Sequence, residues 1–208
     1  MLHLLLEIPQ RKIYFIDQAS SCASFLIVDE KIGGILVNAP GFSKGLLEDI
    51  TAVCTPKFLF LPSHLGATDA DIDEWKNHTS LEVIAHEIET PLISSPVDIS
   101  INHKTKLSRT IDFVPMAGRT PGSCALYLKN LPGILFFGPI LSIGNGAWPD
   151  LIPQANDFSF ESRMFGALGL KDIKFEYAFT DDFSLQSVNF GDSACQAICD
   201  NIDAFFSR

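Results

Sequence analysis

The sequence lacks paired cysteines and long apolar runs, and each absence argues against a class of protein. Its five cysteines are odd in number, widely spaced and form no C-x-x-C pair, which argues against a disulfide framework or a zinc knuckle. No stretch reaches the roughly 18 apolar residues that a membrane-spanning helix needs. The short apolar run at residues 1–6 has no basic start and is ended by Glu7 and Pro9, unlike a signal peptide. We therefore expect a cytoplasmic protein.

Basic residues are scarce and do not cluster. The chain has 15 Lys and Arg against 25 Asp and Glu, a formal charge of −10. Such a charge repels phosphate groups, so we expect neither nucleic acid nor an anionic membrane as a partner. Charged residues make up only 19% of the sequence, which argues against long disordered tails.

Apolar residues are plentiful. Hydrophobic residues make up 47% of the 208 residues and include 17 Phe, enough for a sizeable core. No linker divides the chain, so we expect one domain over residues 1–208. The high Phe content also leaves a homo-oligomer open, since apolar residues could cover a subunit face.

The first half of the chain alternates strands and helices. Apolar, branched runs predict strands, and Ser43 and either Thr68 or Asp69 are suitable first caps for two helices. In the second half, several strands precede a long irregular stretch at 142–157, and Asp192 is expected to cap the last helix. This order is typical of a layered α/β protein. The strands are expected at 13–17, 23–29, 35–38, 58–61, 81–85, 99–107, 111–116, 124–128, 134–137 and 175–180, and the later helices at 160–168 and 193–206.

Three segments in sequence order resemble the metallo-β-lactamase superfamily. Residues 23–40 resemble the family's opening hairpin, with Asn38 standing at its Asp, and residues 58–64 resemble a buried strand entering a loop. Residues 118–123, Gly-Arg-Thr-Pro-Gly-Ser, are similar to the family's G-H-T-P-G-S turn, and the strand at 135–138 ends in Phe-Phe-Gly as expected. The resemblance covers roughly residues 15–183. It implies an α/β (α+β) fold, a four-layered αββα sandwich with two facing sheets and helices outside.

The resemblance also implies a metal site at one edge of that sandwich. In the family, loops there hold one or two metal ions that activate water for hydrolysis of esters, amides, thioesters or phosphoesters. The first ligand motif is H-x-H-x-D-H. Here His64 retains the first His, whereas Gly66, Thr68 and Asp69 stand at the second His, the Asp and the last His.

The later ligand positions are replaced as well. Arg119 stands at the His of G-H-T-P-G-S, Pro139 at the bridging Asp, and Asp181 and Asp182 where a Gly-His pair is expected. Arginine has no acceptor and stays charged, so it does not ligate a metal. At about 4 Å, and with an effective dielectric near 20, each like-charge pair costs roughly 4 kcal/mol.

These replacements favour a non-catalytic binding or structural protein without a cofactor, whose partner is an unknown small molecule or protein. The alternative is a divergent hydrolase with one Zn, Fe or Mn ion held by His64, Asp69 and Asp182, since a catalytic zinc site needs about three protein ligands. We further expect Arg119 to replace the lost metal charge by pairing with Asp69, Asp181 or Asp182, or else to bind an anion. His86 and Glu87 are expected to be an exposed pair at a strand end.

Overall fold

The computed structural model describes residues 1–18, 22–144, 146–186 and 188–207. Its larger sheet has seven strands, which lie in the sheet in the order in which they occur in the chain. The first four are antiparallel and the last four, β4 to β7, are parallel. The seven strands are β1 (Leu2–Ile8), β2 (Arg11–Ile16), β3 (Ser24–Asp29), β4 (Gly33–Val37), β5 (Pro56–Leu61), β6 (Glu82–His86) and β7 (Ile99–Ile101).

The second sheet has four strands in the order β13-β10-β9-β8. These are β8 (Ile111–Pro115), β9 (Cys124–Leu128), β10 (Ile134–Gly138) and β13 (Tyr177–Thr180). The strands β11 (Ser142–Ile143) and β12 (Pro149–Asp150) form a small separate ladder. The helices are α1 (Lys44–Val53), α2 (Asp69–Thr79), α3 (Phe160–Leu168) and α4 (Ala194–Phe206), with short 3-10 turns η1 (His64–Gly66), η2 (Thr90–Leu92) and η3 (Gly169–Asp172).

Two helices connect the parallel strands of the larger sheet, because parallel neighbours need a crossover. The helix α1 joins β4 to β5, and α2 joins β5 to β6. The Ser43 side chain accepts a hydrogen bond from the Leu46 N–H and so caps α1 as predicted. Thr68 accepts one from the Asp71 N–H and caps α2. Ile72 and Trp75, the predicted apolar face of α2, are buried.

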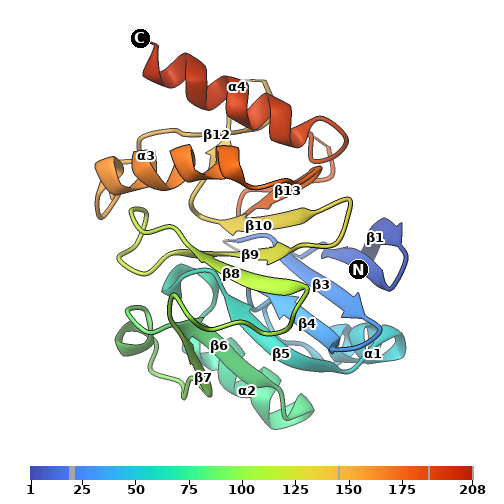
Figure 1. The fold of residues 1–208 in the computed structure, drawn as a ribbon. Coiled ribbons are helices and arrows are strands. Elements are labelled where there is room, and N and C mark those ends of the chain that lie inside the picture. The colour runs from blue at the N-terminus through green and yellow to red at the C-terminus, as the bar shows by residue number, and fades with distance from the viewer. Residues whose placement is uncertain (19–21, 145, 187, 208) are drawn as a thin grey trace.

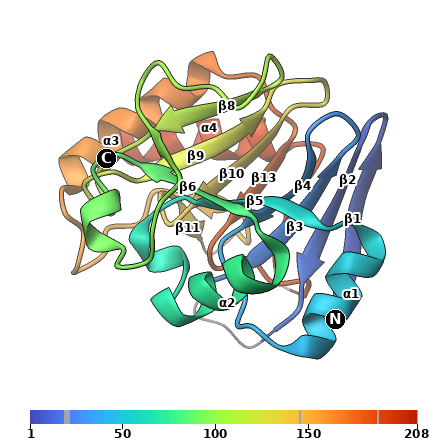
Figure 2. The same cartoon turned by 90° about the horizontal axis from the view of Figure 1, so that it is seen from below.

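Three apolar clusters separate four layers. One lies between the sheets, one between the larger sheet and α1 and α2, and one between the smaller sheet and α3 and α4. Figure 1 shows α3 and α4 on one outer side, and Figure 2 shows α1 and α2 on the other. The cluster between the sheets is rich in Phe, and Phe25 contacts four other rings at centroid distances of 5.1–5.8 Å. The predicted mixed α/β fold is therefore confirmed, and these layers are compatible with the predicted αββα sandwich.

Some local predictions were wrong. The strand expected at 99–107 ends at Ile101, because Asn102 starts a turn in which its side chain accepts the Lys104 N–H. The final helix is preceded by Ser193 as N-cap, and Asp192 instead adopts a positive φ of 50°. The apolar run near the N-terminus forms β1. Within the described residues, no helix is long and apolar enough to cross a membrane.

Candidate functional site

Loops from both sheets meet at one edge of the sandwich. Parallel strands place their carboxyl ends at the same edge, so Asn38 after β4, His64 after β5 and Glu89 after β6 lie near one another. The smaller sheet contributes Asp181, which follows β13. The Ala23 N–H donates to the Asp181 backbone carbonyl at 2.6 Å, which joins the two sheets at this edge.

Glu89 is the centre of a buried network at this edge. Its side chain has 0% exposure, and its Oε2 atom lies 2.8 Å from the His64 backbone N and 2.6 Å from His64 Nδ1. Its Oε1 atom accepts the Gly122 N–H at 2.6 Å. Burial alone raises the pKa of Glu89, but the hydrogen bonds from His64, Thr120 and Gly122 together lower it below its ordinary value. One ionised carboxylate thus ties together the loops after β5 and β6 and the Thr-Pro-Gly-Ser turn.

His64 is oriented by this network. Because an ionised Glu89 only accepts hydrogen bonds, Nδ1 of His64 carries the proton, and Nε2 is the ring atom left for other contacts. The His64 side chain is 28% exposed. Metal-ligating histidines are commonly held in this way by a carboxylate on the other ring nitrogen.

A second network lies beside the first and contains Asn38 and Asp181. The Asn38 Nδ2 atom donates to the Ala23 carbonyl at 2.8 Å and to Asp181 Oδ1 at 2.7 Å. Asp181 as a whole is partly buried, but its Oδ2 atom is fully covered and, within the described part of the chain, receives no well-formed hydrogen bond. Burial raises the pKa of Asp181 to about 6, against the lowering effects of Asn38 and of the nearby Cys22 thiol.

Gly66 packs directly against this network. A Cβ atom at Gly66 would lie 2.1 Å from Asn38 Oδ1, far closer than any real contact. Asn38 is 1% exposed and anchored by both of its amide hydrogens, so it has little freedom to move away. A side chain at position 66 therefore does not fit, because Asn38 fills the space beside Gly66, the residue that the sequence resemblance aligns with the family's second His.

Arg119, Pro139, Asp181 and Asp182 are brought together, as predicted for one loop edge. They line one cavity of about 160 Å³ together with Leu65 and others. Arg119 does not pair with any of the three aspartates expected. Its Nη1 atom donates to the Asn156 carbonyl at 2.8 Å and lies 3.8 Å from Asp157 Oδ1. The predicted pairing with Asp69, Asp181 or Asp182 was therefore wrong, although Arg119 does face the cavity that two of them line.

A second arginine, Arg163 on α3, fixes the wall of this cavity. Arg163 is fully buried, and its guanidinium donates to the carbonyls of Ile140 and Ile152 and to both carboxylate oxygens of Asp157. Asp157 therefore lies between two arginines, Arg119 and Arg163. This arrangement anchors the irregular stretch at 142–157 to α3.

Thr68 and Asp69 lie apart from these networks. Thr68 caps α2, and the Asp69 carboxylate accepts the N–H groups of Ser94 and Ser95 at 2.8 and 3.1 Å. These bonds, with that of Ser95 first, lower the pKa of Asp69. Asp69 is thus bound to the segment before β7, and neither it nor Thr68 lines the cavity.

The described residues do not fit a metal of the family's kind. Among them, no group of three or more His, Cys, Asp and Glu side chains is placed to hold an ion. The trio His64, Asp69 and Asp182 is not assembled, since His64 binds Glu89, Asp69 binds Ser94 and Ser95, and Asp182 accepts the Ile143 N–H and the Thr180 hydroxyl. Arg119 and Pro139 supply no donor to a metal.

Sequence reasoning missed Glu89, Asp157 and Arg163. It considered the neighbours His86 and Glu87 and expected both to be exposed. Glu87 is exposed, but His86 is 8% exposed and buried beside Gly122, whose Cβ would lie 3.0 Å from His86 Nδ1. One signal in the sequence could have identified Glu89. Polar residues that follow neighbouring parallel strands, such as β5 and β6, lie at the same edge of the sheet.

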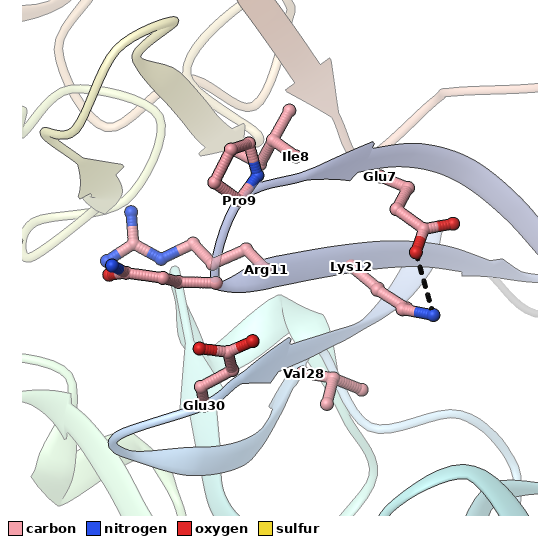
Figure 3. Close-up of a pocket in the computed structure, with 8 residues that line it drawn as sticks. Glu7, Ile8, Pro9, Arg11, Lys12, Val28 and Glu30 are labelled. Atoms are coloured by element: carbon pink, nitrogen blue, oxygen red, sulfur yellow. Dashed lines mark ion pairs between the residues drawn. The ribbon is translucent and has the colours of Figure 1, made fainter.

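A larger cavity of about 410 Å³ lies at the opposite end of the strands, over the turn between β1 and β2 (Figure 3). The register places Arg11 beside Asp29 and Ile16 beside Ser24, so this turn is remote from Ala23 and the loop edge. Figure 3 shows Arg11 turned away from the Glu7–Lys12 ion pair, and its guanidinium instead binds Asp29 and Thr110. Glu7, Lys12 and Arg11 are engaged in ion pairs, and of the charged residues that line this cavity only Glu30 has no ion pair among the described residues. The smaller cavity is the one lined by residues of the loop edge.

The sequence matches no protein-family model and no curated protein sequence. The structure is similar to BJP-1, a subclass B3 metallo-β-lactamase of Bradyrhizobium japonicum, with TM-score 0.60, 15% identity and coverage of 94% of this chain and 90% of that chain. It is also similar to a mutant of FEZ-1, the metallo-β-lactamase from Legionella gormanii (TM-score 0.66, 15% identity, 94% and 91% coverage). A Cronobacter sakazakii metallo-β-lactamase with a HARLDQ motif gives TM-score 0.65, 12% identity and 96% and 90% coverage.

The chain therefore has the metallo-β-lactamase fold, as the sequence resemblance predicted. At identities of 11–15%, this likeness concerns the fold alone. What the chain does has to be argued from its own residues at the loop edge.

Proposed function

We propose that this chain is a non-catalytic binding protein, which keeps the metallo-β-lactamase fold and has lost most of the family's metal ligands. The observation that carries this proposal is the contact between Gly66 and Asn38. A Cβ at position 66 would lie 2.1 Å from Asn38 Oδ1, so an imidazole has no room there. Glycine thus replaces the expected His, and Asn38 packs into the space beside it. This packing supports the proposal that the site no longer binds metal.

Two further features support the proposal. Arg119 and Pro139 stand where the family has a His and an Asp, and both line the cavity. The buried Glu89 carboxylate joins three loops at this edge through hydrogen bonds. A metal ion is therefore not needed to hold these loops, and the cavity is free to bind a small molecule.

One observation favours a second candidate, a divergent hydrolase with a single metal ion. The Glu89–His64 contact engages Nδ1 of His64 and leaves Nε2 as the ring nitrogen available to a metal ion. Against it, a catalytic zinc needs about three protein ligands, and Asp69 is held by Ser94 and Ser95.

Elemental analysis separates the two candidates. The protein is purified without chelators and without added metal, and Zn, Fe and Mn are counted per chain. We expect well below one ion per chain, at the same level in His64→Gln and in the exposed control His103→Gln. One ion per chain that is lost in His64→Gln, and retained in His103→Gln, would overturn the proposal and establish the metal-binding candidate.

A further inference from the structure

We propose that the cavity at the loop edge binds a small zwitterionic molecule, one that carries both an ammonium group and a carboxylate. This proposal rests on the binding function proposed above and names its ligand class. It is argued from the distribution of charge around the cavity, which has Arg119 on one part of its wall and Asp181 and Asp182 on another.

Arg119 supplies the part of the wall that receives a carboxylate. Its Nη1 atom is used by the Asn156 carbonyl, and its side chain is 11% exposed. Within the described residues, neither Nε nor Nη2 makes a hydrogen bond, and neither is a buried atom without a partner. These two nitrogens form one edge of the guanidinium, which can bind both oxygens of a carboxylate at once.

Asp182 supplies the part that receives an ammonium group. Each of its carboxylate oxygens accepts one hydrogen bond, from the Thr180 hydroxyl at 2.6 Å and from the Ile143 N–H at 2.8 Å. An ionised carboxylate has about four acceptor positions, so two are left for a ligand. Asp182 is exposed and lines the cavity, with Asp181 beside it in the chain.

The three charges act on one another. Burial is the main cause of the raised pKa of Asp181, but the charge of Asp182 also raises it and the charge of Arg119 lowers it. All three groups therefore lie within Coulombic reach. A simple anion at Arg119 meets two carboxylates, and a simple cation at Asp182 meets a guanidinium. A ligand with both charges pairs its carboxylate with Arg119 and its ammonium group with Asp182. Ligands with a single charge are disfavoured, because each meets a like charge in the same cavity.

The size and walls of the cavity suit a small ligand. Its volume is about 160 Å³. Leu65, Pro139 and Leu141 give it apolar wall as well, which suits a short aliphatic part between or beside the charged groups. Small free amino acids have these properties.

Calorimetric titration of the full chain tests the proposal. Glycine, L-alanine and β-alanine are compared with acetate and propionate, which lack the ammonium group, and with ethylamine, which lacks the carboxylate. We expect at least one of the amino acids to bind at least about tenfold more tightly than the matched acid and amine, since a charge-assisted hydrogen bond contributes that much. Equal binding of acid and amino acid, or no binding of any amino acid, would overturn the inference.

Variants locate the binding. Arg119→Gln and Asp182→Asn should each weaken amino-acid binding at least about tenfold, whereas Arg109→Gln, a change at an exposed arginine, should leave it unchanged. If Arg119→Gln fails to fold, Arg119→Lys keeps the charge and loses the two-nitrogen edge, and it too should weaken binding. An amino acid that binds equally to all variants overturns the proposal.

Failure of this inference differs from failure of the proposed function. If acetate binds as well as the amino acids and its binding is lost in Arg119→Gln, the proposed binding function stands and the zwitterionic ligand is rejected. One metal ion per chain that is lost in His64→Gln and retained in His103→Gln rejects the binding function itself.

Discussion

At the scale of single residues, the Glu89 carboxylate joins three loops at one edge of the sandwich. Glu89 has 0% exposure and accepts the His64 N–H, His64 Nδ1–H and Gly122 N–H. A buried acceptor with several donors is costly to disturb, because the Gly122 N–H is buried and the two His64 donors are partly buried, so each would lose its partner out of full contact with water. The residue is therefore the structural centre of the edge, although it takes no part in the sequence resemblance.

Replacement of Glu89 by Gln should destabilise the protein. The amide presents N–H groups to donors that need an acceptor, and the charge is lost, so we expect a loss of about 2–3 kcal/mol in the free energy of unfolding. Urea denaturation at neutral pH measures this. Glu87→Gln, an exposed change two residues away, should stay within about 0.5 kcal/mol of the parent. Equal stability of the two variants would contradict the role assigned to Glu89.

Asp181 gives a prediction on pH dependence. Burial raises its pKa from 3.8 to about 6 in the folded protein. Between these values the folded state holds a proton on Asp181 that the unfolded state has lost, so the contribution of Asp181 to stability falls as pH rises from about 4 to 6 and is then level. The full shift corresponds to an upper limit of about 3 kcal/mol.

Asp181→Asn removes this titration and can still accept the Asn38 hydrogen bond through its carbonyl oxygen. The free energy of unfolding of the variant minus that of the parent should therefore be about 1–3 kcal/mol greater at pH 7.5 than at pH 4. Denaturant unfolding at both pH values gives the difference. A difference between variant and parent that is the same at pH 4 and pH 7.5 would show that Asp181 titrates normally.

At the scale of elements, η1 is shaped by its contact with the end of β4. Gly66 N–H donates to the Ser63 carbonyl, and the Gly66 carbonyl accepts the Ala39 N–H at 2.9 Å, so the turn is held against the chain after β4. The close approach of Gly66 to Asn38 depends on the absence of a side chain. A pair of glycine substitutions tests this packing.

Gly66→Ala should destabilise the protein by about 2 kcal/mol or more, because a Cβ 2.1 Å from Asn38 Oδ1 forces a buried, anchored amide to move. Gly45→Ala is the matched control. Gly45 lies in α1 with no atom within 4 Å of an added Cβ, so alanine should be neutral or stabilise by up to about 1 kcal/mol. Thermal or urea unfolding of both variants measures the contrast. Similar stabilities for the two variants would mean that η1 can move away from Asn38 at little cost in stability.

At the scale of the whole molecule, the layered fold could be predicted from the sequence. Strand and helix patterns, the caps Ser43 and Thr68, and the Thr-Pro-Gly-Ser turn are local signals, and the structure agrees with them. Residues 102–107 were misread because their alternation mimics a strand while Asn102 forms a turn. The extent of β1 was not anticipated from its short apolar run.

The contacts at the loop edge could be predicted only in part. Sequence matching placed Arg119, Pro139, Asp181 and Asp182 at one edge, and they line one cavity. It did not predict that Arg119 would bind the segment at 156–157, or that Glu89 would bind His64 and Gly122. Such pairs join segments 25 or more residues apart, and their partners depend on how loops pack rather than on local pattern.

We propose that hydrogen bonds among this chain's own side chains, and not a metal ion, hold the loop edge together. Thermal unfolding with excess zinc and with EDTA tests this proposal. A metal ion that binds the folded state raises the unfolding midpoint, because at 100 times its dissociation constant it adds about 2.7 kcal/mol to the free energy of unfolding. We predict the same midpoint in zinc, in EDTA and in plain buffer. A midpoint that rises with zinc and falls with EDTA, and loses both responses in His64→Gln, would show that a metal ion stabilises this edge.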